Sequence, residues 1–452
     1  MDYVKIFIER LLYPAMNLVR GNRTLEYLQK MKKTQYASRA ELLSFQEGKL
    51  SALLLDCVKN VPYYQKYDYL EEAIKLDPLG ALNQFPILDK ETFRKNSELF
   101  FNSKLPESER IENYTGGSTG EKTRFFMNRE TVEHYEAARW RGLSWHGITP
   151  GSRSVMLWGN PIELSREDQK KYEFKEKWLK NRVIIPAFAL EEQSIRNYVA
   201  KIDAYKPEYI YGYASALDAF AKLMRIEKLN FKCTLKAAVS TAETLYPHQR
   251  ENIEKAFGCR VVNEYGARDA GILAYECSAG ELHISSDNAI IEVIDFPSGK
   301  EVPCGKSGDV VVTDLNNHIM PRLRYRLGDE VILTERRCDC GVNLPLMESI
   351  VGRNDEMLHT PGGLLVHGYL VAKIAQSHPV IKRFQIIQKE VERATLRIEP
   401  AEGRNSADID LFVEEVGAHL PGVAIDVKFG ERIEASPSGK FRYCIGMGDK
   451  AR

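Results

Sequence analysis

The sequence predicts an α/β protein with a large N-terminal domain of several sheets, including a strand-rich subdomain, and a small α+β C-terminal domain. Between residues 105 and 350, short apolar runs closed by turns alternate with helical stretches, as in the buried strands of an α/β core. A polar turn near residues 352–355 then separates two different apolar patterns. The length of 452 residues is enough for two or three domains.

The elements can be placed in order from their periodicity. Residues 1–85 are expected to be helical, with apolar residues at helical spacing (Leu42, Leu50, Leu53, Leu54 and Val58) and a stop at Pro62. The expected buried strands are 154–158, 209–213, 237–241 and 259–265, and helices are expected over 190–204, 215–228 and 247–257. Residues 281–335 are strand-rich. In the last unit we expect paired strands over 384–391 and 392–400, a helix over 408–420 and a third strand over 424–430.

Composition excludes several classes of protein. Hydrophobic residues make up 44% and charged residues 28%, which is not the composition of a disordered chain, a collagen, a coiled coil or a multi-span membrane protein. Lys and Arg together number 63, as do Asp and Glu, so the net charge is zero. A zero balance gives no global attraction to nucleic acid, and no basic run is interleaved with aromatic residues. We therefore expect no nucleic-acid partner.

The cysteines and the N-terminal segment indicate a cytoplasmic location. Eight scattered cysteines do not form a disulfide framework, which favours a reducing compartment. Lys5, Glu9 and Arg10 interrupt the first apolar run, so it is too polar to span a bilayer, and it lacks the features of a signal peptide. Its apolar residues recur at the spacing of an amphipathic helix (Ile6, Leu11, Leu12, Met16 and Val19). Such a helix packs on the body of the protein or, alternatively, lies on a membrane surface.

The segment ENYTGGSTGEKTRFF (112–126) is the most unusual in the chain. Its small residues leave backbone amides open to hold phosphate oxygens, and the hydroxyls of Thr115, Ser118 and Thr119 add donors. It is not the phosphate loop of nucleotide triphosphatases, because Glu121 stands before Lys122 where that motif needs glycine. The residues that follow are typical of a strand and not of a helix. We therefore predict a glycine-rich hairpin that binds phosphate, with a plain flexible turn as the alternative.

Four further segments are weak signals when each is taken alone. Residues 263–269 (NEYGARD) follow a predicted strand, where α/β proteins place ligands. Residues 325–329 (YRLGD) form a turn with a carboxylate able to hold two ribose hydroxyls. Residues 352–355 (GRND) lie at the domain boundary, and residues 438–440 (SGK) form a loop near the C-terminus.

Together, these segments resemble the adenylate-forming ligases, a superfamily of acyl- and aryl-CoA synthetases, over residues 90–445. The short C-terminal domain is similar to that of the phenylacetate–CoA ligase branch. The opening helices and residues 184–192 (IIPAFALEE) resemble relatives from capsule and surface-polysaccharide biosynthesis clusters. The resemblance implies a core domain over 1–353, with a helical lead-in (1–85) and the strand-rich subdomain (281–350). A mobile small domain over 356–452 completes it.

The resemblance implies a role for each matching residue. The phosphate loop is matched by Thr115, Gly116, Gly117, Ser118, Thr119 and Gly120, with Gly116 in place of Ser and Lys122 in place of Pro. The adenine and ribose residues are Ala242, Glu243, Asn263, Tyr265, Gly266, Asp329 and Arg353. Asp269 stands where the family has its magnesium-binding Glu, and Arg268 replaces a Ser or Thr that contacts phosphate. Asp355 matches the hinge, Lys440 matches the catalytic lysine, and the acyl pocket includes Tyr211, Tyr213 and Ala214.

This resemblance implies an ATP-dependent ligase that joins a small carboxylic acid to AMP and releases pyrophosphate. Both reactants are anions, so Lys440 and Mg²⁺ offset the repulsion between them. The acceptor of the acyl group is coenzyme A or, alternatively, an amine on a sugar or metabolite used for surface polysaccharide. The substitutions Arg268 and Asp269 leave open a non-catalytic nucleotide-binding scaffold, against which the glycine loop, Asp329 and Lys440 argue.

Four residues have the composition of a structural zinc site. Cys277 and His283 lie in one predicted turn region and Cys338 and Cys340 in another, which gives a Cys₃His set. All four coordination positions of zinc are then filled by protein, so the ion stabilises the fold and does not react. The alternative is four unrelated residues.

Overall fold

The computed structural model describes most of the chain and divides it into two compact units. The structure describes all residues except 1–5, 116–122, 159–173, 175, 178–179, 188–189, 191, 296–297, 354–355, 379, 401–406, 431–432, 434–440 and 448–452. Unit 1 comprises Met1–Leu327 and Val331–Val351. Unit 2 comprises Gly328–Glu330 and Gly352–Arg452.

Unit 1 is built on a twelve-stranded sheet in the order β11-β10-β12-β13-β14-β9-β8-β7-β6-β5-β3-β4. The last five strands in this order are parallel: β7 (Val261–Ala267), β6 (Ala237–Thr241), β5 (Tyr209–Tyr213), β3 (Ser154–Trp158) and β4 (Arg182–Pro186). Three of them have the predicted bounds. The fourth predicted strand, β7, begins at Val261 and not at 259, because Gly258 first ends the preceding helix in a left-handed conformation (φ 65°).

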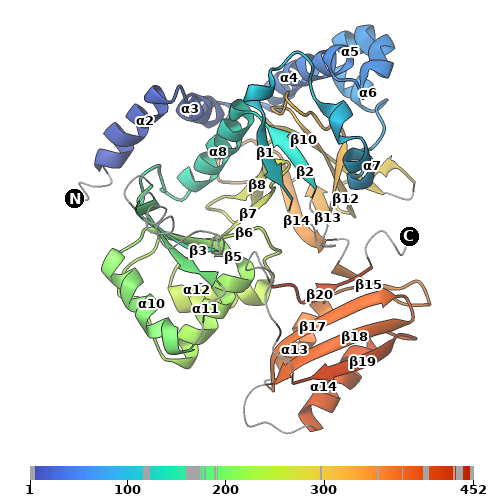
Figure 1. Ribbon diagram of the computed structural model, residues 1–452. Helices are drawn as coiled ribbons and strands as arrows, with labels where there is room; N and C mark the ends of the chain where they lie inside the picture. Colours follow the sequence, from blue (N-terminus) through green and yellow to red (C-terminus); the bar gives the residue numbers. More distant parts are fainter. Residues whose placement is uncertain are drawn as a thin grey trace. The chain divides into compact units, whose positions relative to one another are not determined.

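Helices cover both faces of the parallel strands (Figure 1). One face packs against α10 (Glu192–Tyr205), α11 (Ala214–Ile226) and α12 (Pro247–Phe257), and the other against α3 (Thr24–Thr34) and α8 (Arg129–Ser144). Successive strand residues point to opposite faces of the sheet, so Ile210 packs on the α11 side and Tyr211 packs on the α8 side. Burial on both faces explains why these strands are continuous apolar runs in the sequence.

The antiparallel strands extend the same sheet and confirm the predicted strand-rich region. They are β8 (Gly271–Glu276), β9 (Leu282–Ile284), β14 (Leu346–Arg353), β13 (Tyr325–Thr334), β12 (Ser307–Asp314), β10 (Ala289–Asp295) and β11 (Lys300–Glu301). A separate hairpin is formed by β1 (Ile111–Tyr114) and β2 (Arg124–Met127).

The N-terminal region is helical as predicted. Its longest helix, α4 (Arg39–Asn60), starts at a capping box between Ser38 and Glu41 and buries the predicted apolar face. Further helical segments are η2 (Gln65–Leu70), α5 (Glu71–Leu76), α6 (Pro78–Leu82), α7 (Lys90–Lys95), η3 (Ser97–Phe100) and η4 (Glu107–Glu109). Their apolar side chains share one core with the antiparallel strands.

The first helix packs on the body of unit 1 along one side only. A π-helical turn, η1 (Ile8–Leu12), leads into α2 (Tyr13–Val19). Ile8 is buried, and the Tyr13 hydroxyl donates to Glu136 of α8 at 3.3 Å. However, Leu11 and Val19 are exposed, so the predicted amphipathic helix packs on the body only in part. The wide π turn shifts the helical phase at this point. Among the described residues, none of the helices is sufficiently long and apolar to cross a membrane.

Unit 2 has its own sheet, in the order β19-β18-β17-β20, and its own core. The predicted strands are β17 (Ile381–Glu390), β18 (Arg393–Pro400) and β19 (Ala424–Phe429), and the predicted helix is α14 (Ala407–Ala418). Unpredicted elements are β20 (Cys444–Ile445), α13 (Tyr369–Ser377), and the hairpin of β15 (Met357–His359) and β16 (Leu365–His367).

Candidate active site

The glycine-rich segment joins β1 and β2, which confirms a hairpin and excludes a strand-to-helix phosphate loop. Its base is closed by Thr115 and Thr123. The Thr115 N–H donates to the Thr123 carbonyl at 2.9 Å, and the Thr123 N–H donates to Thr115 Oγ1 at 3.2 Å. Residues Gly116–Gly120 of the predicted phosphate loop lie outside the described residues.

Arg268 lies at the base of this hairpin. It follows β7 and is exposed, and its Nη1 donates to the backbone carbonyl of Tyr114 at 3.1 Å. The guanidinium therefore contacts the residue that directly precedes Thr115, and the glycine-rich loop begins at Thr115. A fixed positive charge at this point is suited to binding phosphate oxygens.

The predicted adenine segment follows β6 and contains a strained residue. Ala242 has φ 65°, a left-handed conformation that costs a non-glycine residue about 1 kcal/mol or more and is concentrated at functional sites. The next residue, Glu243, accepts a hydrogen bond from the Ser215 N–H at 2.8 Å, which ties this turn to the first turn of α11.

The Tyr265-Gly266 pair lies on β7 where the strand pairs irregularly with β8. Tyr265 is buried, and a side chain at Gly266 would place its Cβ only 2.4 Å from the Gly271 carbonyl oxygen. This close approach explains the glycine. The backbone N–H of Asn263 donates to Glu276 of β8 at 2.9 Å, which ties the two strands together further along.

Asp269 is buried and carries an unsatisfied carboxylate oxygen. It is 6% exposed, and no hydrogen-bond partner for its Oδ2 exists among the described residues. Burial and the nearby charge of Asp269 raise the pKa of Tyr325. A buried carboxylate oxygen without a donor is a strong ligand for a hard cation, so Asp269 fits a magnesium ion.

A polar cluster joins β5, β6 and β7 to α8, and we call its four residues (Arg139, Tyr211, Thr241 and Glu264) the Glu264 cluster. The buried Glu264 carboxylate accepts from the Tyr211 hydroxyl at 2.6 Å and from the Thr241 hydroxyl at 3.0 Å through Oε1. Its Oε2 accepts from Nε of Arg139, on α8, at 3.1 Å. Burial raises the pKa of Tyr211, so this hydroxyl stays a donor. Burial opposes the charge of Arg139, but Glu264 keeps the pKa of that guanidinium above its ordinary value.

Sequence analysis identified one member of the Glu264 cluster, Tyr211, as an acyl-pocket residue. Glu264 has a weak signal, because it stands between two nominated residues, Asn263 and Tyr265. Arg139 has no signal in the sequence, because it is on a helix that is far from Glu264 along the chain. The other nominated pocket residues are close: the Tyr213 ring lies against Trp158, tilted by 31° with ring centroids 4.2 Å apart, and Ala214 begins α11.

In unit 2, the predicted ribose residue Asp329 is paired with Arg353. Nη1 of Arg353 lies 3.5 Å from Oδ1 of Asp329, and Asp329 is 9% exposed. The predicted hinge residue Asp355 and the predicted catalytic Lys440 lie outside the described residues.

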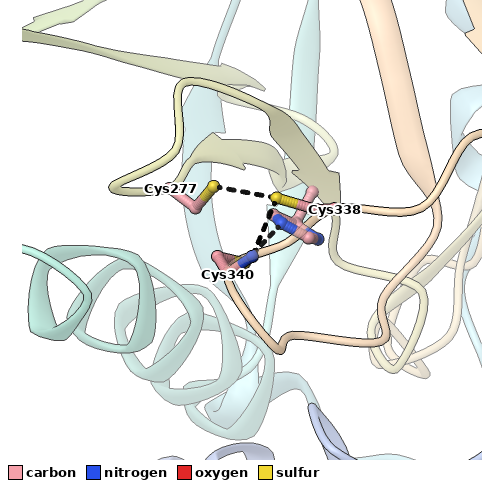
Figure 2. Close-up of side chains that lie close together, drawn as sticks. Cys277, Cys338 and Cys340 are labelled. Carbon is pink, nitrogen blue, oxygen red and sulfur yellow. Dashed lines mark hydrogen bonds between the residues drawn. The ribbon is translucent and has the colours of Figure 1, made fainter.

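The four predicted zinc ligands come together in unit 1. The ligand atoms of Cys277, His283, Cys338 and Cys340 all lie within 4.8 Å of one another. Cys277 follows β8, His283 is on β9, and the other two cysteines occupy the loop between β13 and β14. Figure 2 shows the loop of Cys277 beside the loop that carries Cys338 and Cys340.

The surroundings of these four residues suit a tetrahedral metal. Cys277 Sγ and Cys338 Sγ are 3.6 Å apart, near the roughly 3.8 Å expected between two thiolates on one zinc. His283 directs Nδ1 to the Leu344 carbonyl at 3.1 Å, which leaves Nε2 pointing to Cys340 Sγ at 3.2 Å. Such a second bond orients a ligating imidazole.

Each sulfur also accepts a backbone N–H from two residues further along, at 3.4 Å in all three cases, from Ala279, Cys340 and Val342. These bonds stabilise thiolates. Burial raises the pKa of Cys338 and of Cys340. Burial also acts on Cys277, but hydrogen bonds from His283 and from the backbone lower the pKa of its thiol.

Comparison with curated proteins finds relatives that are similar over most of the chain. It is 24% identical over 412 residues to protein CapK of Staphylococcus aureus, covering 86% of this chain and 88% of CapK. It is 26% identical to the phenylacetate–coenzyme A ligase of Thermus thermophilus, covering 80% and 82% of the two chains. No family model matches the chain.

Solved structures show the same fold. A 2-hydroxyisobutyryl-CoA ligase in its postadenylation state superposes with a TM-score of 0.71 at 22% identity, covering 92% of this chain and 91% of that one. The same comparison finds an ATP-bound MatB of Rhodopseudomonas palustris, with a TM-score of 0.52 at 16% identity over 74% of this chain and 66% of that one. The predicted fold class is therefore confirmed.

Proposed function

We propose that this chain, a relative of the phenylacetate–CoA ligases and of protein CapK with the fold of the adenylate-forming enzymes, is an ATP-dependent, AMP-forming acid–thiol ligase. It activates a carboxylic acid as an acyl- or aryl-adenylate and transfers the acyl group to coenzyme A. The observation that carries this proposal is the gathering of separate segments around the strand ends of unit 1. The base of the glycine hairpin lies beside Arg268. Tyr265 lies on β7, Asp269 follows β7, and the strained Ala242 follows the neighbouring β6.

In the proposed reaction, each residue either offsets the charge of the substrates or holds a substrate in position. The loop Thr115–Gly120 and Arg268 hold the phosphates that leave as pyrophosphate. Ala242, Glu243, Asn263, Tyr265 and Gly266 shape the adenine site, while Asp329 and Arg353 bind the ribose. Asp269 would hold Mg²⁺, which when bound neutralises phosphate charge. Lys440 bridges the acid and the α-phosphate and stabilises charge that develops between them.

The second half-reaction needs a different arrangement of the same catalytic parts. A lysine on the small domain that leaves the site after the first step allows the thiol to approach the acyl carbon. We propose Asp355 as the hinge of that motion. The products separate the two possible acceptors: incubation with ATP, acid and coenzyme A gives AMP and a thioester, identified by mass. An amide formed only when an amine is supplied would instead identify an acid–amine ligase that serves surface-polysaccharide synthesis. Release of ADP would contradict both.

A non-catalytic scaffold is not favoured by the position of the two substituted residues. Arg268 lies at the hairpin base, and Asp269 retains a buried carboxylate suited to a cation. Arg268 therefore adds a positive charge suited to phosphate, and Asp269 keeps the negative charge that magnesium binding requires.

Arg268 is predicted to supply a phosphate contact. We expect Arg268→Thr to raise the KM for ATP about tenfold, because a charge-assisted contact of about 1.5 kcal/mol or more is lost. The KM of the acid should stay the same. Arg225→Thr, at an exposed arginine in the last turn of α11, is the matched control and should change neither constant. An unchanged KM for ATP in Arg268→Thr would remove this role.

Asp269 is predicted to bind magnesium. We expect Asp269→Asn to need at least about tenfold more Mg²⁺ for half-maximal adenylation, because a charged oxygen ligand is lost. Without Mg²⁺ its Tm should be no lower than that of the wild type, because a buried unpaired charge has been removed. Asp269→Glu should retain Mg²⁺ dependence. A lower Tm for Asp269→Asn with unchanged Mg²⁺ dependence would indicate a purely structural residue.

We also propose that Cys277, His283, Cys338 and Cys340 hold one structural zinc ion. The compact ligand set, the backbone N–H bonds to sulfur and the oriented imidazole support it. With four protein ligands the ion has no open position for chemistry, so it would fasten the loop between β13 and β14 to the turn between β8 and β9.

A further inference from the structure

The Glu264 cluster places a charge pair and two hydroxyls between α8 and the parallel strands β5, β6 and β7 of unit 1. Oε1 of Glu264 accepts from Tyr211 and Thr241, and Oε2 accepts from Arg139. The Glu264 side chain is only 1% exposed. Three donors therefore satisfy the carboxylate, and Glu264 itself has little capacity left for a ligand.

Arg139 differs from Glu264 because it remains accessible. Its side chain is 42% exposed, although Nε and Nη2 are directed to Glu264 at 3.1 and 3.5 Å. Its guanidinium also lies 5.7 Å from the centre of the Tyr211 ring, which limits its position on one side. Nη1 has no acceptor in the part of the chain that the structure describes. A pre-positioned guanidinium with free N–H donors is suited to recognise an acceptor group on a ligand.

The position of the cluster connects it to the acyl group. Tyr211 is a proposed acyl-pocket residue, and Thr241 directly precedes Ala242 in the proposed adenine segment. Glu264 stands between Asn263 and Tyr265 on β7, and alternation along the strand directs its side chain to the opposite face of the sheet. Thr241 therefore links the proposed adenine segment to the same carboxylate that Arg139 contacts.

Charge balance narrows the chemistry of that acceptor. Arg139 and Glu264 already form a neutral pair, so a second carboxylate on the substrate would add an uncompensated negative charge beside a buried anion. A hydrocarbon group would desolvate the free N–H donors of Arg139 without replacing their hydrogen bonds. A neutral hydroxyl oxygen avoids both costs, because it accepts from Arg139 without adding charge.

We propose that the Glu264 cluster determines acid specificity and that the acid activated by this enzyme carries a hydroxyl group on its acyl part, bound by Arg139. This inference rests on the proposed function and deepens it. Glu264, Tyr211 and Thr241 act as positioning residues, since they hold the guanidinium in place and do not themselves bind the hydroxyl.

The test uses matched acids that differ by one hydroxyl, such as phenylacetate with its ring-hydroxylated form and butyrate with 3-hydroxybutyrate. For the full-length wild-type chain we expect the hydroxylated member of the preferred pair to have at least about tenfold higher kcat/KM for adenylation. The double variant Arg139→Met, Glu264→Leu removes both charges with little change in volume. In this double variant, the ratio of kcat/KM between the hydroxylated and the unhydroxylated acid should fall to about twofold or less.

The matched control is Arg129→Met, also on α8, where Arg129 pairs with the buried Glu133 at 2.8 Å. It should keep the wild-type preference. Adenylation that favours the unhydroxylated acid of every pair would overturn this inference and leave the proposed function standing. A double variant that keeps the preference would also overturn it. Absence of adenylation with every acid would instead overturn the proposed function and this inference with it.

Discussion

Lys440→Ala is expected to lower the rate of acyl-adenylate formation by about 10³-fold or more, while thioester formation from supplied acyl-adenylate is largely retained. The reason is electrostatic. In the first half-reaction, a carboxylate attacks a phosphorus atom that is already surrounded by negative oxygens, and a fixed ammonium stabilises the charge that develops. In the second half-reaction, a thiol attacks an activated acyl carbon, and the lysine has no comparable task.

Two measurements separate these steps. Single-turnover adenylation gives the first rate, and thioester formation from purified acyl-adenylate gives the second. Lys428→Ala, at an exposed lysine of β19, is the control in the same unit and should leave both rates unchanged. Equal loss of the two rates in Lys440→Ala would contradict the proposed role and indicate a structural effect.

Loss of one zinc ligand is the second change for which we expect a large effect. Cys338→Ser should lower the zinc content from about one ion per chain to well below one and reduce Tm by several degrees, because a structural zinc site contributes directly to folding free energy. The site fastens two loops that are about 60 residues apart in the chain, so both loops lose a tether (Figure 2).

The control for this change is Cys304→Ser, at an exposed cysteine outside the cluster. It should keep the zinc content and the Tm of the wild type. Metal analysis is done on protein purified without chelators. A wild-type protein that contains no zinc, together with a Cys338→Ser variant as stable as Cys304→Ser, would contradict the proposed site.

The parallel strands were predictable because they are buried on both faces. The runs at 154–158, 209–213 and 237–241 are short, continuous and end at turns, so their length and the turn residues locate them. The Cys₃His cluster was predictable for a different reason, since Cys-x-Cys with a further Cys and His is an unusual composition. The hairpin was predictable because the residues after the glycines are typical of a strand.

Other features depend on tertiary contacts that leave little trace in the sequence. The helix α8 carries buried charges among its apolar residues, and its Arg141 pairs with Asp287 at 2.6 Å inside unit 1. For the same reason Arg139 had no signal as a site residue, since its partner Glu264 is 125 positions away. The exposed Leu11 and Val19 follow from a π turn that a regular helical spacing does not anticipate.

Carboxylate-dependent exchange of labelled pyrophosphate into ATP tests the central claim most directly, because it reports the reversible first half-reaction without requiring the acceptor to be known. The wild-type chain is incubated with Mg²⁺, ATP and a panel of aryl, short acyl, hydroxy, amino and sugar acids. We predict exchange with at least one acid and none without acid, and loss of that exchange in Lys440→Ala. No exchange with any acid, in a protein shown to bind ATP, would contradict the claim that this chain forms acyl-adenylates.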